Sequence, residues 1–377
     1  MIIPPFKLEQ YFRDREFTLP YHLSSSDCEP VLVKELLARA HPILASAYKE
    51  MSLGYTESQG HPVLREKISR MYDTVIPDEI LTVVPEEGIY IAMRALLNPG
   101  DNVIVTCPGY QSLYTIAEMC GCTVTKWFPR TDQGWHFDPD DLAHLVRENT
   151  KMIVVNFPHN PTGALPTKEE FTSIVEVARA YRAILFSDEM YRGLEFDPNN
   201  GLPLPAACDT YENAVSLTGF SKVFGLAGLR LGWLATKNRE YMGRLVGYKD
   251  FTTICGSAPS ELLGIMALED ATWLIECNKK IIRENLDTLR RFLDEEYPDI
   301  FSWTEPKAGS VCFPRFSGNH TGFSSVEGVC NDLESAGVML VPGSMFEYPG
   351  NYFRIGLGRE SFLQALDRFR DYLFTLT

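Results

Sequence analysis

Apolar runs alternate with amphipathic segments along most of the chain. Runs such as residues 102–107 (NVIVTC) are typical of strands that are covered on both faces. The segment after Thr167 has helical periodicity to about Tyr181, with Thr167 as N-cap and Glu170 at the capping-box position. This alternation predicts an α/β protein with a mostly parallel, doubly wound sheet, whose ligand site lies at the carboxyl ends of the strands.

The same pattern predicts individual elements up to about residue 235. Helices are expected at residues 86–97, 113–120 and 138–147, in addition to the one that follows Thr167. Further strands are expected at residues 123–127, 152–156, 183–186, 214–218 and 229–235.

From about residue 275 the pattern changes to that of a compact α+β unit. One long helix is expected at residues 272–296, then short strands at 311–315, 338–341 and 352–357, and a final amphipathic helix from Ser361. We therefore expect a large domain at 41–275 and a small α+β domain at 276–377. Residues 1–40 have no strong pattern, and we expect them to pack with the small domain.

Composition and charge exclude several classes of protein. With 35 Lys and Arg against 50 Asp and Glu, the net charge of −15 argues against a surface for nucleic acid or anionic membrane. Nine scattered cysteines without a CxxC pair indicate reduced thiols in a cytoplasmic enzyme. The first residues do not resemble a signal peptide. The apolar stretch at 214–235 is interrupted by Lys222 and Arg230 and is therefore not expected to be a transmembrane helix. The seven histidines lack the spacing of metal ligands.

Three polar clusters each follow a predicted strand, at 156–163 (NFPHNPTG), 188–191 (DEMY) and 218–230 (TGFSKVFGLAGLR). A buried Lys222 would be a nucleophilic amine, although alone it also fits an exposed loop lysine. Asp188 at a strand end is able to hold a protonated ring nitrogen, but it also fits a turn or helix cap. Asn160 is first of all a turn residue. The expected topology brings the three clusters to one edge of the sheet.

The order Asn160, Asp188, Tyr191, Lys222, Arg230 resembles that of the class I/II aminotransferases, fold-type I enzymes that use pyridoxal 5'-phosphate (PLP). The resembling segments are NPTG at 160–163, DEMY at 188–191, SKVFGLAGLRLGW at 221–233, LGYTESQGHPVLREKI at 53–68 and YFRIGLGR at 352–359. They span most of the chain in the family's order. The resemblance implies the fold-type I transferase fold, with a large domain around a mostly parallel seven-stranded sheet and a smaller α+β domain.

The resemblance also implies catalytic residues. Lys222 is similar to the lysine that forms the internal aldimine with PLP and then shuttles a proton. Asp188 is similar to the partner of the pyridinium nitrogen, and Asn160 and Tyr191 to the two donors to the phenolic oxygen of the ring. Arg354 is similar to the arginine that binds the substrate α-carboxylate, near Asn160.

The remaining implied contacts are to the ring and the phosphate. Tyr110 resembles the aromatic residue that stacks on the ring, and Tyr55 the tyrosine that reaches the phosphate of a neighbouring subunit, which implies a homodimer. The phosphate contacts are implied for the Arg230 side chain, the hydroxyl of Ser221 or Thr218, and the amides of Glu86 and Glu87.

Two segments depart from the family pattern. Val84, Pro85 and Glu86 stand where the family usually has a Gly-Ala/Ser run, and Pro85 has no amide to donate to a phosphate. Gly219 is not such a departure: the family often has serine there, three residues before the lysine, but many members have this variant. Residues 23–27 (LSSSD) replace the glycine-containing segment that approaches the substrate carboxylate, which suggests a reshaped substrate pocket.

These observations predict a PLP-dependent aminotransferase that moves the amino group of an α-amino acid to a 2-oxo acid by a ping-pong mechanism. The alternative on the same fold is a lyase or biosynthetic enzyme, C–S lyase-like or capreomycidine synthase-like, because the same lysine, aspartate and arginine serve these reactions. A PLP-sensing regulator is disfavoured by the short N-terminal segment and the acidic charge. No motif supports a second, side-chain-reading arginine among the candidates Arg13, Arg15, Arg192 and Arg315.

Overall fold

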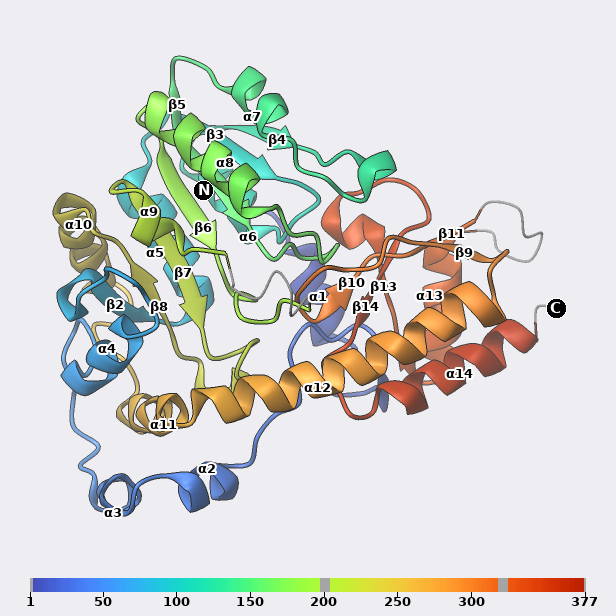
Figure 1. Ribbon diagram of the computed structural model, residues 1–377, viewed down its shortest axis with the longest axis horizontal. Helices are drawn as coiled ribbons and strands as arrows, with labels where there is room; N and C mark the ends of the chain where they lie inside the picture. The colour runs from blue at the N-terminus through green and yellow to red at the C-terminus, as the bar shows by residue number, and fades with distance from the viewer. Residues whose placement is uncertain (1–2, 197–203, 318–324, 376–377) are drawn as a thin grey trace.

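The computed structural model describes residues 3–196, 204–317 and 325–375 (Figure 1). Its largest element is a seven-stranded sheet of order β2-β8-β7-β6-β5-β3-β4. Neighbours from β7 to β4 are parallel, whereas β8 is antiparallel to both β7 and β2, so the mostly parallel sheet is confirmed. The strands are β2 (Ile80–Val83), β3 (Asn102–Thr106), β4 (Thr123–Trp127), β5 (Thr150–Asn156), β6 (Ile184–Asp188), β7 (Ala214–Gly219) and β8 (Gly232–Ala235).

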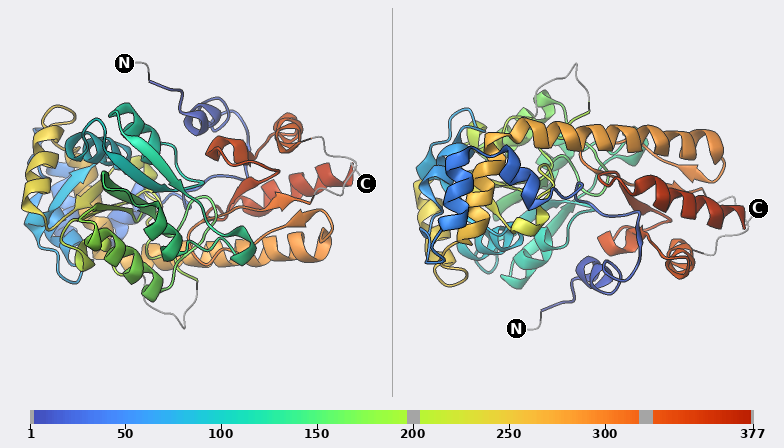
Figure 2. Two further views of the ribbon diagram at one scale, coloured as in Figure 1. Left: turned by 90° about the horizontal axis from the view of Figure 1, so that it is seen from above. Right: turned by 90° about the horizontal axis from the view of Figure 1, so that it is seen from below.

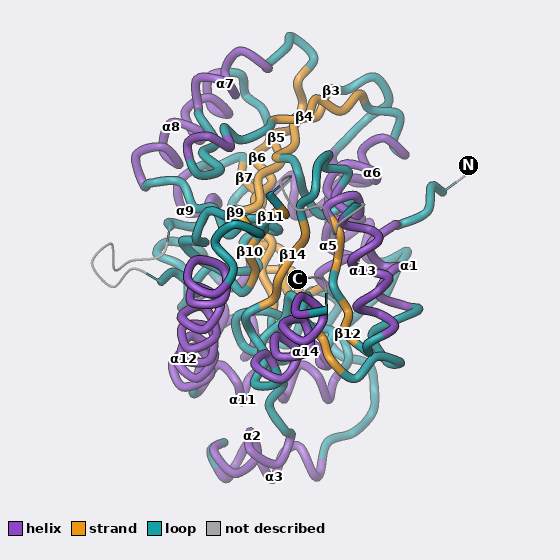
Figure 3. The backbone as a smooth tube through the Cα atoms, turned by 90° about the vertical axis from the view of Figure 1, so that its right-hand side faces the viewer, coloured by secondary structure: helices purple, strands orange, loops and turns teal. Residues whose placement is uncertain are grey.

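Helices cover both faces of this sheet (Figure 3). Met152 and Val154 of β5 belong to one apolar cluster, with α5 (Pro85–Leu96), α6 (Ser112–Met119) and α10 (Arg239–Lys249). Ile153 and Val155 belong to the opposite cluster, with α7 (Pro139–Leu145) and α8 (Lys168–Ala180). The strand is therefore buried on both faces, which explains its continuous apolar sequence.

The expected capping box is present at the start of α8. Thr167 Oγ1 accepts the Glu170 amide at 3.1 Å, and the Glu170 carboxylate accepts the Thr167 amide at 2.7 Å. The strand expected at 229–235 is shorter than predicted, because residues 227–229 form the 3-10 turn η3 (Ala227–Leu229) and Arg230 is left-handed at φ 49°. The strand β8 therefore begins only at Gly232.

The C-terminal part is built on the long helix α12 (Ala271–Arg290), which continues as the π-helical turn η4 (Arg291–Glu296). The predicted strand at 311–315 is two strands, since Pro314 between them has no N–H. The predicted strand at 338–341 is also two, which pair with different partners. The elements are β9 (Phe301–Ser302), β10 (Val311–Cys312), β11 (Arg315–Phe316), α13 (Val326–Ser335), β12 (Val338–Met339), β13 (Val341–Pro342), η5 (Gly343–Phe346), β14 (Phe353–Gly356) and α14 (Phe362–Phe374).

The N-terminal residues contact both parts of the molecule (Figure 2). The helix α1 (Lys7–Arg13) lies beside η5, with Tyr11 Oη donating to the Leu340 carbonyl at 2.6 Å, and β1 (Tyr21–His22) pairs with β12. The helix α2 (Val33–Arg39) packs instead on α11 (Ala258–Glu269), as do α3 (Pro42–Glu50) and α4 (Pro62–Ser69). Short elements complete the chain: η1 (Pro77–Glu79), η2 (Thr131–Gln133) and α9 (Ala207–Thr210). No helix within the described ranges is long and apolar enough to cross a membrane.

Candidate active site

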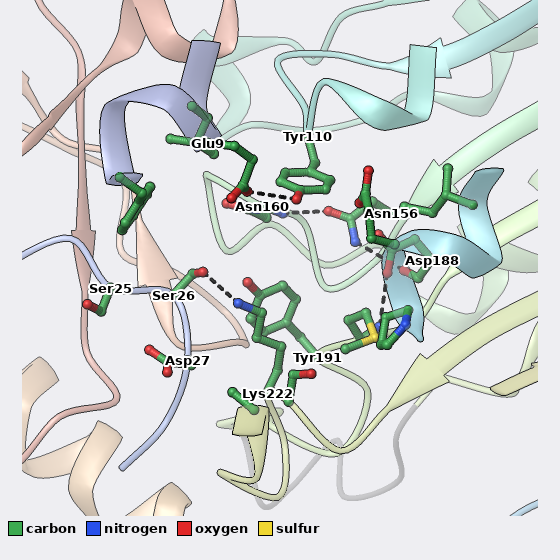
Figure 4. A pocket seen from close by; sticks show the side chains of 18 of the residues that line it. Glu9, Ser25, Ser26, Asp27, Tyr110, Asn156, Asn160, Asp188, Tyr191 and Lys222 are labelled. Atoms are coloured by element: carbon green, nitrogen blue, oxygen red, sulfur yellow. Dashed lines mark hydrogen bonds between the residues drawn. The ribbon is translucent and has the colours of Figure 1, made fainter. Parts of the chain in front are cut away.

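A cavity of about 300 Å³ lies at the carboxyl ends of the parallel strands, between the sheet, α1 and β14 (Figure 4). It gathers nine of the residues expected at the site from distant parts of the sequence: Glu86, Tyr110, Asn160, Asp188, Tyr191, Ser221, Lys222, Arg230 and Arg354. Glu87 and Tyr55 do not line it. The Glu87 carboxylate accepts the Val84 amide at 3.4 Å, and Tyr55 is 92% exposed on the surface.

The sheet positions two of the polar side chains directly. Asn156 and Asp188 are the last residues of β5 and β6 and are paired in register. The side-chain Nδ2 of Asn156 donates to the Asp188 backbone carbonyl at 3.1 Å, and its Oδ1 accepts the Asn160 backbone amide at 2.8 Å. Asn156 thus holds the 156–163 loop against the Asp188 strand end. The sequence analysis placed Asn156 in the polar cluster at 156–163 but gave it no role, although a polar residue that ends an apolar strand was the available signal.

Asp188 is a buried carboxylate with few partners. It is 6% exposed, and its Oδ1 accepts the Met190 amide at 3.2 Å. Burial raises the pKa of Asp188 to about 7, although the charge of Lys222 opposes the rise. A cationic N–H group placed beside this carboxylate would offset its lost hydration.

The loop after β7 carries Ser221 and Lys222. Lys222 Nζ donates to Ser26 Oγ at 2.7 Å, and Ser221 Oγ is buried without a hydrogen-bond partner among the described residues. Because β8 is antiparallel to β7, its first residues lie at the edge where the parallel strands end, which brings the exposed Arg230 to the same cavity. Arg230 has a left-handed backbone, which is unfavourable for a residue with a Cβ and is often found at functional sites.

The helix α5 begins close to the sheet. A Cβ on Gly219 would lie 3.0 Å from Pro85 Cγ, and one on Gly232 only 2.8 Å from it, so the proline ring packs on two bare backbones. The amides of Glu86 and Glu87 have no partner within the helix, and they carry the positive end of its dipole. The Glu86 carboxylate accepts a hydrogen bond from Ser112 Oγ, and burial raises the pKa of Glu86.

Arg354 of β14 forms the opposite end of the cavity. It is 1% exposed, its Nη1 donates to Asn160 Oδ1 at 3.2 Å, and its Nη2 donates to the Ser24 carbonyl at 2.8 Å. Its Nε is buried without a partner among the described residues. The guanidinium is thus held rigidly and keeps a free donor, as a carboxylate-binding arginine requires.

The segment at 24–27 reaches the cavity because Gly356, the last residue of β14, and Gly358 after it carry no side chains. A Cβ on Gly356 would lie 1.8 Å from the Ser25 carbonyl oxygen, and one on Gly358 2.4 Å from that of Asp27. These glycines of the YFRIGLGR segment therefore allow the backbone at 24–27 to lie directly against β14. This contact places Ser26 beside Lys222.

Tyr110 connects the cavity to the N-terminal helix. Its hydroxyl donates to Glu9 Oε1 at 2.8 Å, and its ring lies 5.0 Å from that of Phe6 between centroids. Glu9, Glu16 and Ser25 also line the cavity. Ser25 belongs to the 23–27 segment that the sequence analysis singled out. Glu9 and Glu16 were not selected, because the first 30 residues carry no periodic pattern.

Comparison with known proteins assigns this chain to a family. The family described as aminotransferase class I and II matches residues 23–368. The aspartate aminotransferase of Pyrococcus horikoshii is 31% identical over 329 residues, which are 83% of this chain and 81% of that protein. The capreomycidine synthase of Streptomyces vinaceus is 30% identical over 350 residues, covering 91% and 87% of the two chains.

A solved structure supports the same assignment. The PLP-dependent aminotransferase from Streptococcus suis has a TM-score of 0.92 and 29% identity, with 100% of this chain and 99% of that chain covered. The chain belongs to the class I and II aminotransferase family and is a PLP-dependent aminotransferase with the fold-type I architecture.

The cavity also fits the family's cofactor on its own chemistry. The buried carboxylate of Asp188 suits a protonated ring nitrogen, and the unpartnered Ser221 hydroxyl, Arg230 and the free amides of α5 suit a phosphate. Between these two ends lies the primary amine of Lys222.

Proposed function

We propose that this aminotransferase moves the amino group of an α-amino acid to a 2-oxo acid in a ping-pong cycle, with Lys222 as the covalent anchor of PLP. The observation that carries the proposal is the arrangement of Lys222 Nζ in one cavity with the buried Asp188 and the buried Arg354. When bound, PLP supplies an aldehyde that reacts with amines and a ring that accepts the electron pair left at the substrate Cα.

The chain's own residues then have defined tasks. Asp188 accepts the ring N–H and keeps this nitrogen protonated, for which its burial and single backbone hydrogen bond suit it. Lys222 Nζ takes the proton from the substrate Cα. Among the described side chains it is hydrogen-bonded to Ser26 Oγ alone, so no carboxylate holds the amine in its charged form. Tyr191 donates to the phenolic oxygen of the cofactor.

Asn160 serves two partners in this proposal. Its Oδ1 accepts from Arg354 at 3.2 Å, which leaves its amide N–H groups for the phenolic oxygen of the cofactor. Arg354, with its free Nε, binds the substrate α-carboxylate beside Asn160. The same asparagine thereby ties the position of the substrate carboxylate to that of the cofactor ring.

For the phosphate we propose Arg230, Ser221 Oγ and the amides of Glu86 and Glu87. The carboxylate of Glu86 is engaged by Ser112 Oγ and that of Glu87 by the Val84 amide, so both acids contribute their backbone to this site. Tyr110 is proposed to stack on the ring, where its hydroxyl is held by Glu9.

We further propose a cytoplasmic homodimer. Tyr55 and Phe251 are 92% and 91% exposed, and exposed aromatic residues suit a subunit contact through which Tyr55 reaches the partner's phosphate. All nine cysteines are free thiols, as expected in a reducing compartment.

The alternative is an elimination or biosynthetic reaction that uses the same residues. Two observations support this alternative. One is the 30% identity to a capreomycidine synthase, and the other is the hydrogen bond of Lys222 to Ser26, which lies in the segment 24–27 that differs from the family pattern. The Ser26 hydroxyl, which accepts a hydrogen bond from the catalytic amine, is a second group in this proposal through which a proton passes to the substrate.

One experiment separates the two reactions. PLP-loaded enzyme is mixed with single amino acids without a 2-oxo acid, and the products are analysed. Transamination gives one equivalent of 2-oxo acid per site, the amine form of the cofactor and no ammonia. Continued release of ammonia or of a side-chain fragment supports the alternative. Borohydride treatment is expected to fix the cofactor on wild type and on the exposed control Lys280→Ala, but not on Lys222→Ala; cofactor fixed on Lys222→Ala would refute the anchor.

A further inference from the structure

One face of the N-terminal helix lines the cavity and combines apolar and acidic side chains. Leu8 and Phe12 of α1, with Glu16 in the turn after it, are spaced four residues apart. Glu9, one position further round the helix, lines the cavity as well. Figure 4 shows Glu9 pointing into the cavity above Lys222. The wall that faces the sheet is therefore an apolar surface with two carboxylates.

The charges that line the cavity are unequal. The cations are Lys222, Arg230 and Arg354, and the carboxylates are Glu9, Glu16, Asp27, Glu86 and Asp188, which makes three against five. The proposed function directs Arg230 and Arg354 to two anions, a phosphate and an α-carboxylate, so neither is free to neutralise a lining acid. The excess of negative charge therefore persists when cofactor and substrate backbone are bound.

Three of the five carboxylates already have a partner or a task. Asp27 pairs with Arg359 at 2.8 Å, Glu86 accepts from Ser112, and Asp188 is assigned to the ring nitrogen. Glu9 and Glu16 remain.

Glu9 uses one oxygen for the Tyr110 hydroxyl and has the second free. Glu16 is half-buried, and no described residue donates a hydrogen bond or an ion pair to its carboxylate. Burial is the main cause that raises the pKa of Glu16. The charges of Asp27 and Glu9 add to the rise, and those of His22 and Arg359 oppose it. A cation in this part of the cavity would relieve both the lost hydration and the mutual repulsion.

Buried unpartnered donors at the same cavity show that it is built for a ligand. Ser25 Oγ and Arg354 Nε are in side chains that are 3% and 1% exposed, and neither has a partner among the described residues. Unpaired buried polar groups are costly and are rarely kept without a ligand or water to satisfy them.

We propose that Glu9 and Glu16 bind a cationic group on the side chain of the amino-acid substrate, and that the amino donor is a basic amino acid with an aliphatic stem. This inference rests on the proposed function. Leu8 and Phe12 contact the stem, Arg354 holds the α-carboxylate, and the two carboxylates hold the amine or guanidinium at the tip.

The test compares isosteric substrates that differ in charge. Holoenzyme is assayed in the half-reaction, from amino acid to 2-oxo acid, with arginine against citrulline and with ornithine against norleucine. The variants are Glu9→Gln and Glu16→Gln. Asp14→Asn is the matched control, since Asp14 follows the same helix, is exposed and does not line the cavity.

We expect wild type to prefer the cationic member of a pair by about tenfold to a hundredfold in kcat/KM, as for a charged hydrogen bond. Glu16→Gln and Glu9→Gln should each lower this ratio about tenfold, and Asp14→Asn should leave it as in wild type. Cofactor content and thermal unfolding of each variant identify any that is misfolded, for which Glu→Asp at the same position replaces it.

The outcomes also separate this inference from the proposed function. Rapid reaction of neutral or acidic amino acids, with a ratio that neither variant changes, overturns the cationic specificity and leaves the aminotransferase assignment intact. Failure of every amino acid to yield a 2-oxo acid refutes the proposed function, whichever substrate was expected.

Discussion

Replacing Asp188 by asparagine should stabilise the cofactor-free protein while it removes activity. The substitution keeps the size of the side chain and its contact with the Met190 amide, and it removes a buried negative charge. In the holoenzyme the same charge is needed to hold the protonated ring nitrogen. Stability and function should therefore change in opposite directions.

The magnitude follows from the pKa of Asp188, which is about 7 in the folded protein against an ordinary value of 3.8. Because the folded value is the higher one, the folded chain keeps a proton that the unfolded chain loses between about pH 4 and 7. The stability of wild type falls as the pH rises through this window and stays low above it. The difference in pKa corresponds to about 4 kcal/mol of unfolding free energy at pH 8.

The assay is urea unfolding of cofactor-free wild type and Asp188→Asn at pH 5 and pH 8, followed by tryptophan fluorescence. The gain of the variant over wild type should be about 3 kcal/mol larger at pH 8 than at pH 5, since part of the penalty is already present at pH 5. Asp299→Asn, at an exposed carboxylate, is the control and should change stability by less than about 0.5 kcal/mol at either pH.

If Asp188→Asn gains the same unfolding free energy over wild type at both pH values, Asp188 does not have a raised pKa in the folded protein, because only a titrating group produces the pH dependence. A gain that persists undiminished after PLP is added would show that the carboxylate does not interact with a cation of the cofactor.

Three further perturbations test the site. Gly356→Ala should lower the free energy of urea unfolding by about 2 to 3 kcal/mol, because its Cβ would meet the Ser25 carbonyl oxygen. The control Gly243→Ala, on an open helix surface, should be neutral or stabilising by about 0.5–1 kcal/mol. Arg354→Lys should raise KM for the amino acid about tenfold or more by losing the guanidinium fork, and an unchanged KM would remove Arg354 from the substrate site. Mixing Lys222→Ala with Tyr55→Ala subunits should restore about a quarter of wild-type activity if Tyr55 acts across the interface. Random mixing makes about half of the dimers hybrids, and each hybrid carries one intact site of two. No recovery of activity would place Tyr55 outside the partner's site.

Strong periodicity allowed most of the sheet to be predicted from the sequence. The strands β3, β5, β6 and β7 are buried on both faces, so their short apolar runs stand out between amphipathic helices. Residues 229–231 were wrongly included in β8, because the left-handed backbone of Arg230 is a local conformation that an apolar pattern does not encode. The antiparallel direction of β8 was also unpredictable, since direction depends on the route of the chain between strands.

The site was predictable where a residue type has a chemical task next to a strand end. Asp188 and Lys222 follow β6 and β7, and both line the cavity. Glu9 and Glu16 were not predictable, because they reach the cavity only through the packing of α1 on the C-terminal part of the chain. Periodicity within a segment carries no information about such long-range packing.

The proline ring at the start of α5 makes the side chains tolerated at positions 85 and 219 interdependent. A serine at position 219 would bring its Cβ to 3.0 Å from Pro85 Cγ, while removal of Pro85 alone would leave a gap over the bare backbones of Gly219 and Gly232. Reversion of either position by itself is therefore expected to be unfavourable, and the effects of the two substitutions should not add. Variants of this loop should therefore be designed with positions 85 and 219 treated as one unit.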